Sequence, residues 1–83
     1  MKFTEKTIKR LAEIGITESK YEGQYFDKGA TVIVTENSTG PNYVAISVLR
    51  HEGGADKHTL RYMVKRALKL AEQAEKIIKE NGK

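Results

Sequence analysis

The chain has 83 residues with no cysteine and no tryptophan, and 31% of its residues are charged and 39% hydrophobic. This size allows one domain with a modest core, the lack of cysteine excludes disulfides and thiolate metal sites, and the composition is too apolar for a disordered tail. No run approaches the ~20 apolar residues of a membrane helix, and the first residues lack the apolar core of a secretory signal. We therefore expect a cytoplasmic setting and no membrane association.

The net charge of +4 is unevenly distributed along the chain. Residues 1–56 hold seven Lys/Arg and eight Asp/Glu, a balance of −1, whereas residues 57–83 hold eight and three, a balance of +5. All the excess positive charge thus lies in the C-terminal segment. Such a distribution bears on partners and solubility rather than on fold.

The N-terminal segment predicts a short helix over residues 5–14. The hydroxyl of Thr4 suits the N-cap position, where it accepts a hydrogen bond from a free amide of the first turn. Ile8 and Leu11 fall on one apolar stripe, and Gly15 follows where a left-handed residue ends a helix.

Three strands are predicted next, over residues 20–26, 30–36 and 43–49. Asp27-Lys28-Gly29 joins the first two as a tight hairpin in which Gly29 supplies the positive φ angle. The second strand is almost wholly β-branched, and residues 37–42 are dense in turn formers.

The third strand places Val44, Ile46 and Val48 on one face. Alternation of this kind predicts an antiparallel meander with one covered side and one wetter side. Residues 50–55, with two adjacent glycines, form a connector to the last element.

A long helix is predicted over residues 57–80, with Asp56 as N-cap and Asn81-Gly82 as its end. Its apolar residues fall on one broad face: Leu60, Met63, Val64, Ala67, Leu70, Ala71, Ala74, Ile77 and Ile78. A stripe this broad favours packing on a sheet over a coiled-coil seam.

The length of this helix, about 36 Å, exceeds the roughly 23 Å of a seven-residue strand. We therefore expect the helix to extend beyond the sheet. Ile77 and Ile78 in its last turns then pack on the first helix, on a second copy of the chain, or on another protein. The predicted fold is a single α+β domain of order α-β-β-β-α, a three-stranded antiparallel meander packed against a long C-terminal and a short N-terminal helix.

Residues that carry chemistry are few. His51 and His58 are the only histidines, and their spacing across a Gly-Gly loop matches no common zinc pattern. The sequence contains no nucleophile motif, phosphate-binding loop or dinucleotide fingerprint. We therefore predict no enzymatic activity, no metal, no cofactor and no small-molecule substrate.

One face of the long helix is strongly basic. A step of ~100° per residue gathers these side chains opposite the apolar stripe: His58, Arg61, Tyr62, Lys65, Lys69 and Lys76, flanked by Lys57 and Arg66. We call this set the basic face.

The arrangement of these charges disfavours helix stability. Lys57, Arg61, Lys65 and Lys69 are successive (i, i+4) neighbours of like charge, and cations near a helix N-terminus oppose its macrodipole. Residues that cost stability in this way indicate a functional role. The basic face therefore predicts a macromolecular partner with negative charge.

The order of elements, with basic residues opening the second helix, resembles the double-stranded-RNA-binding domain. Lys57, His58 and Arg61 fall where that family's Lys-Lys-x-x-Lys motif contacts phosphates, and the resemblance implies RNA as the partner. It is a resemblance of architecture, since the hairpin turn Asp27-Lys28-Gly29 lacks that family's minor-groove loop and the helix has Leu60, Met63 and Val64 in place of alanines.

Three functions follow from these observations. The first is a small protein inhibitor of the kind that phages and mobile elements encode, whose basic helix docks an acidic or nucleic-acid-handling protein and whose strand aromatics serve as anchors. The alternative is direct binding to the phosphate backbone of RNA or DNA. The second alternative is a structural homodimer through Ile77 and Ile78.

Overall fold

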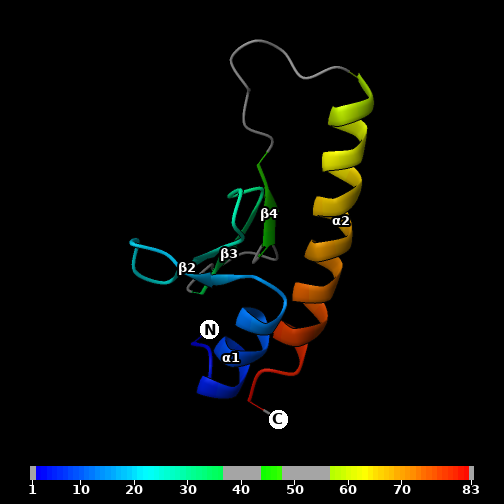
Figure 1. The fold of residues 1–83 in the computed structure, drawn as a ribbon. Helices are drawn as coiled ribbons and strands as arrows, with labels where there is room; N and C mark the ends of the chain where they lie inside the picture. The colour runs from blue at the N-terminus through cyan, green and yellow to red at the C-terminus, as the bar shows by residue number, and fades with distance from the viewer. Residues whose placement is uncertain (1, 37–43, 48–56, 83) are drawn as a thin grey trace.

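A computed structural model describes residues 2–36, 44–47 and 57–82 (Figure 1). The elements in chain order are α1 (Glu5–Glu13), β1 (Thr17–Glu18), β2 (Gln24–Phe26), β3 (Val32–Thr35), β4 (Val44–Ile46) and α2 (Lys57–Lys79). The strands form one antiparallel sheet in the order β1-β2-β3-β4. The predicted α+β class is confirmed, and the sheet has a fourth strand that the sequence did not indicate.

The additional strand arises because residues 19–23 turn the chain instead of extending it. The turn is closed by Ser19, whose N–H and hydroxyl both donate to the carbonyl of Gln24, at 3.0 and 2.9 Å. Gly23 adopts a φ of 77°, which favours glycine. The turn folds Thr17–Glu18 back against β2, with Thr17 opposite Phe26. The strand predicted over residues 20–26 is thereby shortened to Gln24–Phe26.

The β2–β3 turn is held by Asp27 rather than by a glycine conformation. The two carboxylate oxygens of Asp27 accept from Thr31 Oγ1 at 2.7 Å and from the Val32 N–H at 2.9 Å. The residue with positive φ is Ala30, at 53°, so the assignment of that conformation to Gly29 was wrong. The Asp27 carboxylate thus supplies bonds that stabilise a left-handed alanine.

Strand β3 alternates, with Val32 and Val34 fully buried and Ile33 half-buried. The alternation predicted for the third strand is not seen in β4, where Val44 is half-buried but Ala45 and Ile46 are both exposed. Tyr25 lies opposite Val34 and is buried with them, its ring 5.6 Å from that of Phe3. Helix α2 packs along β3 and β4, and α1 lies beside the C-terminal half of α2 (Figure 1). The core therefore lies between the helices and one face of the sheet.

Helix α1 has the predicted ends. Thr4 Oγ1 accepts from the Thr7 N–H at 3.2 Å as N-cap. Gly15 has a φ of 92°, and the N–H of Ile16 donates back to the Leu11 carbonyl at 2.9 Å. This left-handed ending places Ile16 in the core beside Leu11.

Helix α2 does extend beyond the sheet, and the extension is at its N-terminal end. Its buried residues begin at Ala67 and continue through Ala71, Ala74, Ile77 and Ile78. The expectation that the last turns overhang is therefore corrected. The side chains of Ile77 and Ile78 are only 6% and 5% exposed and belong to the same core as α1, so neither is available for a contact with a second copy.

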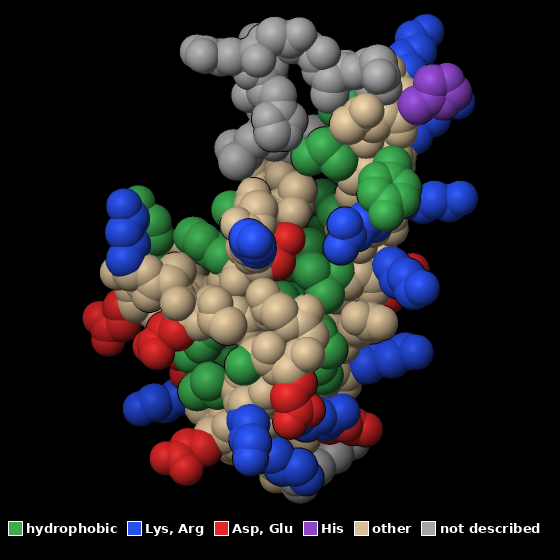
Figure 2. Space-filling view, viewed as in Figure 1, with side chains coloured by type: hydrophobic (Ala, Val, Ile, Leu, Met, Phe, Trp, Pro, Cys, Tyr) green, Lys and Arg blue, Asp and Glu red, His purple; other side chains and the backbone are tan. Residues whose placement is uncertain are grey.

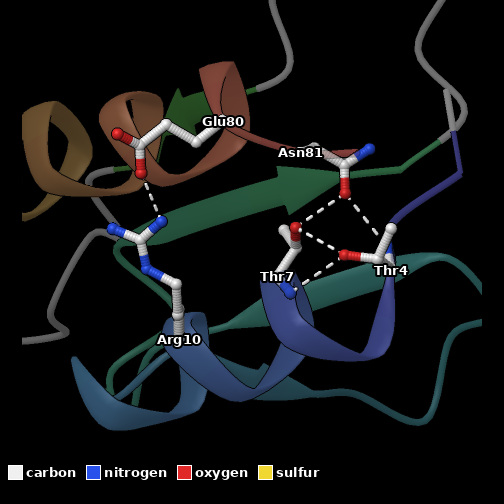
Figure 3. Close-up of polar contacts among 5 residues, drawn as sticks. All are labelled: Thr4, Thr7, Arg10, Glu80 and Asn81. Atoms are coloured by element: carbon white, nitrogen blue, oxygen red, sulfur yellow. Dashed lines mark hydrogen bonds and ion pairs between the residues drawn. The ribbon is translucent and has the colours of Figure 1, made fainter. Parts of the chain in front are cut away.

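The end of α2 is tied to the start of α1 by a polar cluster (Figure 3). Asn81, which follows the helix, accepts through Oδ1 from the Thr4 N–H at 2.9 Å and from Thr7 Oγ1 at 2.6 Å. Its Nδ2 donates to the Lys2 carbonyl at 3.0 Å, and Arg10 forms an ion pair with Glu80 nearby. These contacts anchor the C-terminal half of α2.

Several predictions fall on residues that the structure does not describe: the loop 37–42, the ends of the third strand at Tyr43 and at Val48 and Leu49, the connector 50–55, and the Asp56 cap. Within the described ranges, no helix is both long enough and apolar enough to cross a membrane.

Candidate functional site: the exposed half of helix α2

The N-terminal half of α2 contributes almost nothing to the core. From Lys57 to Arg66 no residue is buried, and only Met63 and Val64 are half-buried. This half therefore presents most of its circumference to solvent while the other half holds it in place. A helix whose other end is anchored in the core offers a surface of regular geometry for recognition.

The structure brings the predicted basic residues together along this helix. His58, Arg61, Lys65 and Lys69 are all exposed, as are the flanking Lys57 and Arg66. Figure 2 shows Lys and Arg side chains along the edge of the molecule that α2 forms. Lys76 is exposed too, but it lies on the anchored half of the helix, among the buried Ala74, Ile77 and Ile78, and so apart from the others. The basic face below therefore excludes Lys76.

These cations are not neutralised by neighbouring acids. In residues 2–36, 44–47 and 57–82, one ion pair is formed, between Arg10 and Glu80. No ion pair in these ranges involves Arg61, Lys65 or Lys69. The first turn of α2 contains no acidic residue that would offset its cations. Their charge is therefore free to act on a partner.

Tyr62 lies within the basic face and is 64% exposed. The guanidinium carbon of Arg66 lies 5.8 Å from the centre of its ring, in the range of a cation–π contact. The ring thereby restrains the Arg66 side chain while its own outer surface stays accessible. A restrained arginine next to an exposed tyrosine is a combination that protein interfaces favour.

An apolar ridge that the sequence analysis missed lies beside the basic face. Leu60 and Leu68 are 37% and 49% exposed and flank Val64 at successive (i, i+4) positions. With Arg61 and Lys65 they line a shallow, open depression on the helix surface. Leu60, Val64 and Leu68 are called the leucine ridge below. The helical angle of Leu60 fits the apolar stripe and predicts a core position, but the first buried residue, Ala67, comes about two turns later.

The strand aromatics proposed as anchors separate into three environments. Tyr25 is buried in the core and Phe26 is half-buried, whereas Tyr21 is 52% exposed with its ring 6.2 Å from that of Phe26. Tyr43 lies outside the described residues. Burial raises the pKa of Tyr25, and the carboxylates of Glu36 and Glu18 add to the shift. This tyrosine is thus a core residue rather than a contact for a partner.

Metal ligation finds no support among the residues with a described position, since no three His, Asp or Glu side chains there are grouped to hold an ion. His58 is exposed at the start of α2, and His51 lies outside the described ranges.

No protein family, no curated protein and no solved structure matches this chain.

Proposed function

We propose that this chain is a small non-enzymatic binding module that docks an acidic protein on the exposed half of α2, in the manner of the inhibitors that phages and mobile elements encode. The observation that carries the proposal is the leucine ridge beside the basic face. Leu60 and Val64 precede Ala67, the first buried residue of α2, and Leu68 is 49% exposed although it follows Ala67. Leu60 and Leu68 gain free energy only from a partner that covers them, and the adjacent Arg61 and Lys65 favour a partner with carboxylates.

Direct binding to nucleic acid is the alternative. Phosphate contacts need cations and hydrogen-bond donors but make no use of exposed leucines. The exposed Lys57, His58 and Arg61 in the first turns of α2 remain compatible with phosphates. The leucine ridge therefore favours the protein partner, and experiment separates the two.

The proposed test is affinity capture from a nuclease-treated lysate of the source cells or their host. The immobilised chain is compared with Arg61→Glu/Lys65→Glu, with Leu60→Ser/Leu68→Ser, and with Lys76→Glu as a matched control on the anchored half. We expect one stoichiometric protein that is lost in both double variants and retained by Lys76→Glu.

A parallel titration with labelled duplex and single-stranded RNA and DNA tests the alternative. Binding at about 50 mM salt that falls steeply with added salt, and that is unaffected by Leu60→Ser/Leu68→Ser, would support nucleic acid and overturn the protein proposal. A protein that is captured only when the nuclease treatment is omitted would also support nucleic acid as the ligand.

A further inference from the structure

A second hollow borders the basic face on the side opposite the leucine ridge. It lies where α2 passes the β2–β3 turn and the end of α1, and its volume is about 570 Å³. Its apolar lining includes Ile14, Met63 and Leu70, each half-buried. In Figure 2, apolar atoms are visible between α2 and the sheet. The hollow is called the turn groove below.

The rim of the turn groove is positively charged. Lys28 from the β2–β3 turn and Arg66 and Lys69 from α2 line it, and all three are exposed. The one acid in the lining is Asp27, and its two carboxylate oxygens already accept from Thr31 Oγ1 and the Val32 N–H. The lining of the groove therefore contains three cations and one carboxylate, and both oxygens of that carboxylate are already hydrogen-bonded within the turn.

Two contacts hold the groove in shape without a ligand. The Asp27 hydrogen bonds stabilise the turn that carries Lys28. The Tyr62 ring, 5.8 Å from the Arg66 guanidinium, restrains the arginine on the other side. Preformed sites of this kind lose less entropy on binding.

We infer that the turn groove receives one large apolar side chain from an acidic segment of the protein partner, with the flanking carboxylates of that segment on Lys28, Arg66 and Lys69. This inference rests on the proposed function and names the chemistry of its partner. The volume is within the ~300–1,000 Å³ range of sites that bury a ligand group. Charge complementarity selects the occupant, because a basic or neutral segment leaves the three rim cations unpaired.

The test uses three labelled ten-residue peptides and the full-length chain. The first peptide has one tryptophan flanked by glutamates, the second has alanine in place of the tryptophan, and the third has lysines in place of the glutamates. Fluorescence anisotropy measures the affinity, and amide chemical shifts locate the site. We expect only the first peptide to bind, with shifts at Gly29, Met63 and Gln73.

Variants of the chain assign this binding to the groove. Lys28→Glu, on the turn and outside α2, is expected to weaken it by about tenfold, and Met63→Ala by a similar factor. Lys76→Glu is the matched control, since Lys76 does not line the groove, and should change the affinity by less than about twofold.

The failure of this inference is distinguishable from failure of the proposed function. Arg61 and Lys65 do not line the turn groove, so Arg61→Glu/Lys65→Glu should abolish capture of the partner but retain most peptide affinity. Equal binding of the tryptophan and alanine peptides, or no effect of Lys28→Glu, would overturn the groove assignment. Shifts at the groove with an RNA oligonucleotide and not with the acidic peptide would overturn it as well.

Discussion

Oδ1 of Asn81 accepts a hydrogen bond from Thr7 Oγ1 at 2.6 Å, across 74 positions of the sequence. The same oxygen accepts from the Thr4 N–H at 2.9 Å, so one amide group joins the first turn of α1 to the end of α2 (Figure 3). With Ile77 and Ile78 in the core directly before it, this contact fixes the C-terminal half of the long helix. Residues 57–66, at the opposite end of the helix, contain no buried side chain.

Replacement of Asn81 with alanine is expected to lower the free energy of unfolding by about 1–3 kcal/mol, because Thr7 is buried and loses its strongest hydrogen-bond partner. Urea unfolding measures the loss. A double-mutant cycle with Thr7→Val provides the control, since Thr7→Val should cost less in the Asn81→Ala background. Additive losses would contradict the proposed pairing.

The two halves of α2 should differ in their contribution to stability. Ile77→Ala is expected to cost about 2–5 kcal/mol, as a buried side chain does, whereas Leu60→Ala should cost less than about 1 kcal/mol. Hydrogen exchange should be faster for amides near Tyr62 than for those near Ala74. Comparable costs at Leu60 and Ile77 would contradict the exposed position of the N-terminal half.

Charge reversal at two lysines of α2 should have opposite effects on the isolated chain. Lys65→Glu places an acid between Arg61 and Lys69, each four residues away, and is expected to stabilise by about 0.5 kcal/mol. Lys76→Glu lies four residues from Glu72 and from Glu80, near the helix C-terminus, and should destabilise by a similar amount.

Thermal unfolding at low salt measures both changes. The difference between the two variants should shrink at high salt, because screening weakens interactions between exposed charges. If Lys65→Glu lowers stability at low salt, then the like charges of the basic face do not destabilise the helix. The functional interpretation of these residues depends on that destabilisation.

Tyr25 predicts a loss of stability at alkaline pH. Its pKa is raised above 10.0 in the folded chain by burial and by the Glu36 and Glu18 carboxylates, so the folded state keeps a proton that the unfolded state releases. The contribution of Tyr25 to the free energy of unfolding is complete below pH 10.0, and it is lost as the pH rises from there through the raised pKa. Tyr25→Phe removes this decline, and because the hydroxyl lies 3.5 Å from Glu36 Oε2 it should cost little at neutral pH.

Urea unfolding of both forms at about pH 8 and about pH 11 checks this effect. The lysines titrate in both forms and cancel in the comparison. An equal alkaline loss in the wild type and in Tyr25→Phe would contradict the assignment to Tyr25.

The elements that the sequence predicted well are those whose ends depend on local chemistry. The Thr4 cap and Gly15 set α1 to within one residue, and the β-branched run set β3. β1 was missed because Thr17 and Glu18 are too few to form an alternating pattern, and their pairing depends on the turn made by Ser19 and Gly23. Ala30 was missed because glycine is the usual left-handed residue and the Asp27 bonds are specific to this turn.

The composition of the basic face was predicted, but its position in the fold was not. Helical periodicity gathers Arg61, Lys65 and Lys69, yet it carries no information about where along α2 the sheet ends. For the same reason Leu60 was expected on the core face although it is exposed, and the overhang was expected at Ile77 and Ile78 rather than at the start of the helix. The contacts of Asn81 were not predicted either, because they join residues more than 70 positions apart.

The most direct test of the proposed docking on α2 is lysine footprinting of the chain with its captured partner. Acetylation of each lysine is measured by mass spectrometry in the free and the bound chain. We predict protection at Lys57, Lys65 and Lys69, with Lys76 and the α1 residue Lys9 unchanged, since those two lie away from the exposed half of the helix. Protection at Lys9 or Lys76 with no change at Lys65 and Lys69 would contradict it.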